Sequence, residues 1–144
     1  MFRKSIHASL ISIILTASCD TPPCVNEVKN RIQSPDGNYY AVVFQRNCGT
    51  TSGNNFQISV LRQDESSGDR QDLLEDGGNT FVIDYPQERY YSASGIPKIT
   101  ARWENASHLL IEYSEGPRIF TQATVIKGVN VRYLASRVPE SARE

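Results

Sequence analysis

A turn sequence early in the chain constrains the fold more than any other feature. Residues 34–37 (SPDG) combine a proline that presets its own backbone, an aspartate suited to the third turn position and a glycine that accepts a left-handed conformation. The segments on either side, 25–33 and 39–47, carry branched and aromatic residues that favour strands. The sequence therefore predicts an antiparallel hairpin.

The register of this hairpin brings two of the three cysteines together. If Ser34 pairs with Asn38 across the turn, the numbers of paired residues sum to 72, and Cys24 and Cys48 have the same sum. Opposed residues of an antiparallel pair have α-carbons about 4.5 to 5.5 Å apart, which a disulfide accepts. We therefore expect a Cys24–Cys48 disulfide.

Alternating apolar and polar residues predict further strands. Phe56, Ile58 and Val60 alternate with Gln57 and Ser59, which indicates a strand with one buried face. The acidic segment 64–78, rich in Ser and Gly, is typical of a long exposed loop. The other predicted strands are 80–85, 98–103, 108–113, 118–126 and 129–134.

No segment after residue 18 shows a helical period, so we predict an all-β fold, either a single antiparallel β-sandwich or a strongly curled antiparallel sheet. Lys127 and Gly128 suit a hairpin turn before the last strand. The expected buried faces of three strands are Ile99, Ala101 and Trp103; Leu109, Ile111 and Tyr113; and Val129, Val131 and Tyr133.

The first 18 residues predict an export signal. Arg3 and Lys4 precede an apolar run that ends at Leu15, and small residues lead to Cys19. The run is shorter than the roughly 20 apolar residues that a bilayer crossing needs. Residues 15–19 (LTASC) resemble the bacterial lipobox, which implies that Cys19 is acylated, for example with palmitate, and becomes the first mature residue. An ordinary secretory leader, cut nearby, is the alternative.

The predicted organisation follows from this leader. Residues 1–18 form the signal peptide, 19–24 a lipid-anchored linker, 25–138 the antiparallel β domain and 139–144 a loose tail. The linker is short and contains two prolines, so it holds the domain close to the bilayer. We expect the protein at the cell membrane, with its domain on the extracytoplasmic, periplasmic side of the envelope, where disulfides persist.

Composition narrows the possible partners. The leader contains two of the 15 Lys and Arg residues, so 13 basic residues face 16 acidic ones in the remaining 126 residues, a net charge of about −3. No basic patch favours a nucleic acid. His108 is the only histidine after the leader. We therefore predict no cofactor and no metal site, and the oligomeric state is open.

Residues 34–61 carry a second resemblance. The SPDG turn, a tyrosine strand that ends in residues 46–49 (RNCG), two threonines and the strand segment 57–60 (QISV) are similar to a family of small, uncharacterised bacterial proteins, often exported. The resemblance implies no activity.

The candidate binding residues lie in loops, where functional groups often sit on a rigid scaffold. The loop after Cys48 offers hydroxyl and amide groups, and a turn-rich segment offers exposed aromatic rings. These residues are Thr50, Thr51, Asn54, Asn55, Tyr90 and Tyr91. They favour a non-catalytic domain that binds another envelope protein or component, although a plain structural loop is the alternative.

The rival hypothesis is a small periplasmic hydrolase. A thiolate needs a neighbouring proton acceptor, so Cys48 and His108 are a candidate nucleophile and base. Asp84 and Glu112 are a candidate carboxylate pair for glycoside hydrolysis. The sequence brings neither pair together.

Overall fold

The computed structural model describes residues 24–49, 54–65, 74–86 and 97–137. None of these residues forms a helix that could span a membrane. The strands are β1 Val25–Gln33, β2 Tyr39–Asn47, β3 Asn54–Arg62, β4 Phe81–Tyr85, β5 Ile99–Asn105, β6 His108–Ser114, β7 Arg118–Gln122, β8 Val125–Ile126 and β9 Val129–Ser136.

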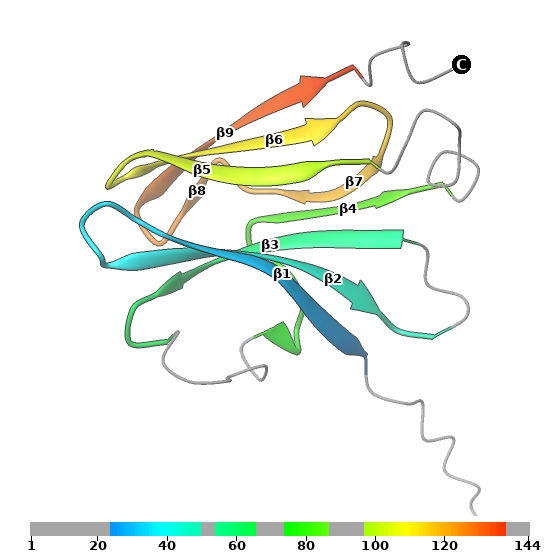
Figure 1. Ribbon diagram of the computed structural model, residues 1–144, viewed down its shortest axis with the longest axis horizontal. Coiled ribbons are helices and arrows are strands. Elements are labelled where there is room, and N and C mark those ends of the chain that lie inside the picture. The colour runs from blue at the N-terminus through cyan, green and yellow to red at the C-terminus, as the bar shows by residue number, and fades with distance from the viewer. Residues whose placement is uncertain (1–23, 50–53, 66–73, 87–96, 138–144) are drawn as a thin grey trace, which may run out of the picture.

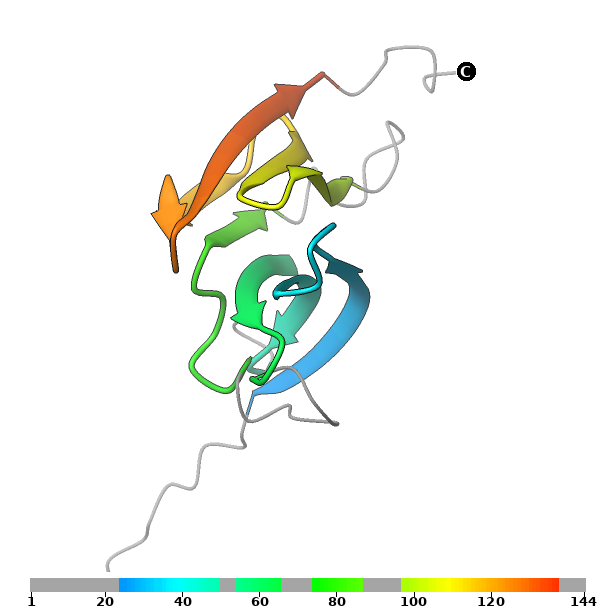
Figure 2. The same ribbon diagram turned by 90° about the vertical axis from the view of Figure 1, so that its left-hand side faces the viewer.

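The strands form two sheets that pack face to face (Figure 1). A five-stranded sheet has the order β1-β2-β3-β4-β7, and a four-stranded sheet has the order β5-β6-β9-β8. Figure 2 shows them as two layers, with β1, β2 and β3 in one and β5, β6 and β9 in the other. All pairs are antiparallel except β6 with β9, which is parallel. The predicted all-β sandwich is confirmed.

The main core lies between the two sheets. The five-stranded sheet contributes buried residues from β2, β3 and β4, and the four-stranded sheet contributes them from β6 and β9. The predicted faces of β5, β6 and β9 are confirmed, because four of their nine residues are buried in this core and the other five are partly buried and pack against it. The ring of Phe81 lies 5.0 Å from that of Tyr113 and 4.9 Å from that of Tyr133, so aromatic contacts join the sheets at its centre.

The first hairpin forms as predicted, but its register near the turn is shifted by one residue. Gly37 has the expected positive φ of 78°. The amide of Ser34 donates to the carbonyl of Tyr39, at 2.9 Å, rather than pairing with Asn38. A β-bulge between Val28 and Asn30 cancels this shift. Beyond the bulge the predicted register holds, and Cys24 and Cys48 form the expected disulfide.

The segment predicted as a long exposed loop is partly buried. Leu74 is only 1% exposed and packs with Val42, Phe44 and Leu61 on the outer face of the five-stranded sheet. Its carbonyl accepts hydrogen bonds from the Asn26 amide, at 3.0 Å, and from the Arg46 guanidinium, at 2.6 Å. Leu74 therefore covers apolar side chains that would otherwise face water. Residues 66–73 of the segment lie outside the described residues.

The residues that follow Leu74 also cover the outer face of β3, so β3 is buried on both faces instead of one. Gln57 and Ser59 are almost fully buried beneath residues 77–80. The Gly78 amide donates to Gln57 Oε1, and the Asn79 amide donates to Ser59 Oγ at 3.1 Å. Both buried side chains, Gln57 and Ser59, thus find a partner, as buried polar groups require.

The predicted strand 118–126 is divided into β7 and β8 because the chain crosses from one sheet to the other. The amide of Ala123 donates to the carbonyl of Thr80 in the five-stranded sheet, at 2.9 Å. The next carbonyl, of Thr124, accepts from Val131 in the four-stranded sheet, at 2.8 Å. This crossing joins the sheets at their edge strands β7 and β8.

At the SPDG end of the molecule, side chains hold the sheets together. Trp103 Nε1 donates to the carbonyl of Ile32 at 2.9 Å, and the Trp103 ring stacks on Tyr39 with centroids 6.3 Å apart. The Tyr39 hydroxyl donates to the carbonyl of Lys127 at 3.0 Å, and Lys127 forms an ion pair with Glu65. The positive φ values of Lys127, 52°, and Gly128, 83°, confirm the predicted turn.

Candidate functional site

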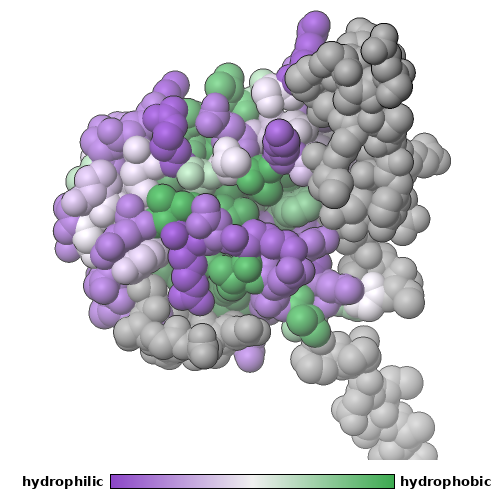
Figure 3. Space-filling model, in the orientation of Figure 1, coloured by the Kyte–Doolittle hydropathy of each residue, from purple (hydrophilic) through white to green (hydrophobic). Residues whose placement is uncertain are grey.

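A cleft of about 350 Å³ opens between the two sheets on the side that β1 and β5 border. Its apolar surface comes from β2, β3 and the start of β5, and a lysine lies on each wall. The described residues that line it are Lys29, Val43, Gln45, Phe56, Pro97, Lys98, Ile99 and Thr100. Figure 3 shows hydrophobic residues along this seam, between two hydrophilic bands.

The cleft exists because the two edge strands diverge. At one end, the Trp103 hydrogen bond to Ile32 holds β5 against β1. The bulge at Lys29 then bends β1, as an extra residue in one strand generally does. Toward Cys24, β1 runs away from β5 (Figure 1). At this end Val43 of β2 and Phe56 of β3, which belong to the main core, line the opening.

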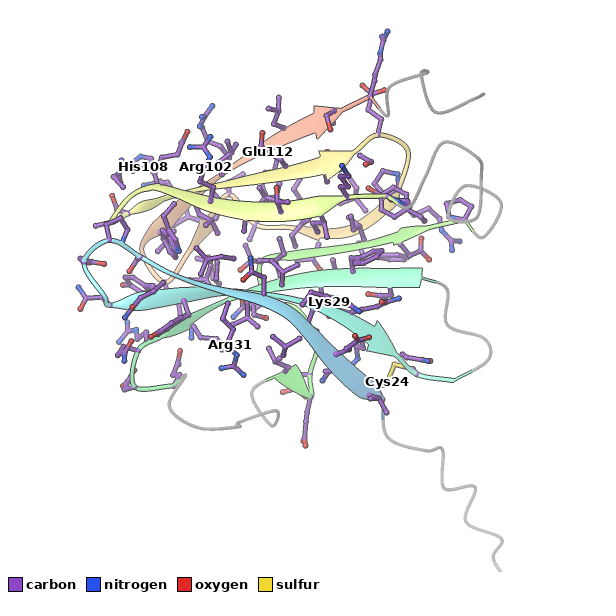
Figure 4. The ribbon with its side chains drawn as sticks, in the orientation of Figure 1. Cys24, Lys29, Arg31, Arg102, His108 and Glu112 are labelled. Atoms are coloured by element: carbon purple, nitrogen blue, oxygen red, sulfur yellow. A yellow bond between two sulfur atoms is a disulfide. The ribbon has the colours of Figure 1, made fainter. Side chains whose placement is uncertain are left out.

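The charges at the cleft are positive. Lys29 Nζ lies 2.6 Å from Glu27 Oε1, but the two side chains are 39% and 68% exposed, so solvent screens this pair. The ammonium of Lys98 has no ion-pair partner among the residues that the structure describes. Its backbone is fixed, because its amide donates to Ser114 Oγ at 3.0 Å and its carbonyl accepts from the Ser114 amide at 3.0 Å. Figure 4 shows Arg31 on the opposite side of β1, away from β5.

The predicted binding loops are only partly described. Thr50, Thr51, Tyr90 and Tyr91 lie outside the described residues. Asn54 begins β3, and the side-chain oxygen of Asn55 accepts a hydrogen bond from Gln57 Nε2 at 2.7 Å. The role of these residues in binding stays a prediction. Phe56, which follows them directly, lines the cleft.

Sequence reasoning missed the lysines and the cleft itself. In the sequence, Lys29 looks like one more residue of a regular strand. The bulge that turns it toward the other sheet depends on the register of the turn. Lys98 is the first residue of the predicted strand 98–103, and only the packing of the sheets places it opposite Lys29. No signal for the bulge is present in the sequence, because the expected Ser34–Asn38 pairing and the two cysteines indicate the same register.

The proposed nucleophile and base are not brought together. Cys48 is bonded to Cys24, so its sulfur is no thiolate. His108 is the first residue of β6, next to the β5–β6 turn, and its Nδ1 is 3.0 Å from Asn105 Oδ1 and 3.1 Å from Ser107 Oγ. Figure 4 shows Cys24 and His108 at opposite ends of the molecule. The Cys48–His108 hypothesis is therefore wrong.

The proposed carboxylate pair is also separated. Asp84 alternates with the core residues Ile83 and Tyr85, so it projects from the outer face of the five-stranded sheet. There the Arg118 guanidinium donates to both of its oxygens, at 2.8 and 2.5 Å. Glu112 alternates with core residues of β6 and projects from the outer face of the other sheet. The whole core lies between the two carboxylates.

Other ionisable side chains have structural partners. The Lys127 ammonium holds the pKa of Glu65 below its ordinary value by donating a hydrogen bond to the carboxylate. The Arg132 guanidinium of β9 does the same for Glu104 of β5, on the far side of β6. Within the ranges that the structure describes, no three His, Cys, Asp or Glu side chains gather to hold a metal ion.

Comparison of the chain with family models, with curated proteins and with solved structures found no match. The resemblances of residues 15–19 and 34–61 therefore stay predictions, and the candidate site rests on the geometry of the cleft.

Proposed function

We propose that this chain is an exported, lipid-anchored binding domain of the bacterial envelope, and that its binding site is the cleft between β1 and β5. The observation that carries this proposal is the Cys24–Cys48 disulfide. Disulfides persist in oxidising compartments and are rare in the cytosol, so this bond agrees with the export signal predicted from the leader.

The position of the disulfide relates the cleft to the anchor. Cys19 and Cys24 are five residues apart, a span of at most about 18 Å. The disulfide fixes Cys24 to the end of β2, and the cleft residues Gln45 and Phe56 lie near the end of β2 and the start of β3. The cleft therefore lies in the half of the domain that the anchor would hold nearest to the bilayer.

The character of the cleft favours binding. Its lining is mainly apolar, and the few polar groups that border it are two lysines, a glutamine and a threonine. Ligand sites commonly combine an apolar lining with a few polar groups that set orientation. The side chains expected of a hydrolase, by contrast, lie far apart.

The test is the chemical state of the three cysteines in protein made by the native host. We expect mass spectrometry to find an acylated Cys19 at the amino terminus and two thiols, Cys24 and Cys48, that react with an alkylating agent only after reduction. Wild-type protein should leave the membrane only with detergent, whereas the Cys19→Ala variant should be released by salt. An unprocessed chain with three reduced thiols would overturn the proposal.

A further inference from the structure

We propose that the cleft binds a long-chain fatty acid taken from the membrane, with its acyl chain between the sheets and its carboxylate between Lys29 and Lys98. This inference rests on the proposed function, because it assumes that the domain is anchored beside a bilayer.

The apolar part of the cleft fits one acyl chain. Val43 and Phe56 are 3% and 6% exposed, so the floor of the cleft is an extension of the main core. Ile99 and Pro97 continue this surface on the opposite wall. The volume of about 350 Å³ lies near the lower end of the range for small-molecule sites, roughly 300 to 1,000 Å³. A single chain suits this volume better than the two chains of a phospholipid.

The cationic part of the cleft requires an anionic group. Lys29 comes from the five-stranded sheet and Lys98 from the start of β5, so a carboxylate at the mouth meets an ammonium from each sheet. Lys98 has no ion-pair partner among the described residues. Lys29 pairs with Glu27, but the Glu27 side chain is 68% exposed, so water can solvate it when Lys29 binds a ligand carboxylate. A charge-assisted hydrogen bond to a carboxylate is stronger than a neutral one.

The position of the cleft favours the membrane as the source. A tether of at most about 18 Å keeps this half of the domain next to the bilayer surface, where the local concentration of fatty acid is high. Transfer from the bilayer into the cleft exchanges one apolar environment for another, so the two lysines supply the selectivity for an anionic headgroup.

The experiment is photolabelling of the full-length chain in its own membranes with a palmitic acid that carries a diazirine. We expect the label on the peptides that contain Phe56 and Ile99. Lys98→Glu and Lys29→Glu should each lower labelling about tenfold, the factor that corresponds to loss of one charge-assisted interaction. Arg102→Glu is the matched control, because Arg102 is exposed on the outer face of the four-stranded sheet and should leave labelling unchanged.

Three outcomes would overturn the inference: equal labelling of the wild type and both lysine variants, equal labelling by a neutral diazirine hexadecanol, or label confined to peptides outside the cleft. Displacement of the probe by lysophosphatidic acid at lower concentration than by palmitic acid would also overturn it, in favour of a phospholipid. The mass of the amino-terminal peptide from the same sample separates the two proposals. An acylated Cys19 with an unlabelled cleft refutes only the ligand, whereas an unprocessed leader refutes the proposed function.

Discussion

Two tyrosine hydroxyls, that of the buried Tyr85 and that of the partly buried Tyr133, connect different elements of the fold. Tyr85 donates to the carbonyl of Ser114 at 2.6 Å, and Tyr133 donates to the carbonyl of Ala123 at 2.6 Å and more weakly to that of Thr80 at 3.2 Å. Burial raises the pKa of Tyr85 to about 12 and that of Tyr133 further. Both hydroxyls therefore stay protonated and act as donors at ordinary pH.

Tyr133→Phe should destabilise the protein, because it removes the donor at the point where the chain crosses between the sheets. We expect a loss of about 1 to 2 kcal/mol in the free energy of unfolding, measured by urea denaturation. Tyr40→Phe is the control, since Tyr40 packs in the outer cluster and its hydroxyl has no hydrogen-bond partner among the described residues. Equal midpoints for the two variants would contradict the structural role of Tyr133.

Gly78 permits the close approach of residues 77–80 to β3. A Cβ at this position would lie 2.9 Å from Gln57 Cβ and 3.1 Å from the carbonyl oxygens of Ile58 and Phe81. Gly78→Ala should therefore cost about 1 to 3 kcal/mol through overpacking. Thr124→Ala, at an exposed position, should leave the urea midpoint almost unchanged. A stabilised Gly78→Ala variant would show that the segment can move away from β3.

At the scale of elements, the first hairpin illustrates what the sequence can and cannot predict. Both of its strands, the glycine turn and the disulfide follow from residue types and from the spacing of the cysteines. The bulge does not, because it depends on how Asp36 organises the turn, by accepting hydrogen bonds from Ser34 Oγ at 2.6 Å and from Asn38 Nδ2 at 2.6 Å. The cleft depends on the bulge, so it too could not be predicted.

The disulfide should contribute strongly to the stability of this hairpin. It links residues separated by 24 positions, and restriction of the unfolded chain by a loop of this length corresponds to about 3 to 4 kcal/mol. The double variant Cys24→Ala, Cys48→Ala should show this loss in urea denaturation, and reductant should shift the wild type by a similar amount. Cys19→Ala is the control. An effect of reductant on the double variant would point to a different origin.

Deletion of Lys29 tests whether the bulge creates the cleft. The deletion lets β1 pair continuously with β2 while Cys24 stays opposite Cys48. We expect the disulfide to form normally and labelling by the diazirine palmitic acid to be lost. Lys29→Ala keeps the bulge and removes only the charge, so it should retain more labelling than the deletion. The reverse order would exclude the bulge as the cause of the opening.

At the scale of the whole molecule, local patterns predict the strands but not their assembly. The alternation of β5, β6 and β9 correctly identifies their buried faces. The parallel pairing of β6 with β9 is not encoded in either strand, because it results from the crossing of β7 and β8 between the sheets. The burial of Leu74 likewise depends on the apolar outer face of β2, which alternation alone does not distinguish from a second core.

Acid should weaken the contact between Lys127 and Glu65, which joins residues 62 positions apart in the sequence. Because the pKa of Glu65 in the folded protein lies below its ordinary value of 4.5, the folded state releases this proton more readily than the unfolded state. The resulting stability is fully present above about pH 4.5 and is lost as the pH falls through the lowered pKa. The urea midpoint of the wild type should fall between pH 5 and pH 3. Glu65→Gln and Lys127→Met should both show a smaller fall over the same range. A variant with the wild-type pH profile would contradict this assignment.

The position of the Cys24–Cys48 bond also determines how the molecule responds to mechanical force. Val25, directly after Cys24, is the first residue of an edge strand, and tension applied there alone would peel β1 from β2 one backbone hydrogen bond at a time. The covalent bond instead passes tension from the tether into β2, which lies inside the sheet. When the amino-terminal tether is pulled in an atomic force microscope, β1 should therefore detach at low force only after the Cys24–Cys48 disulfide has been reduced.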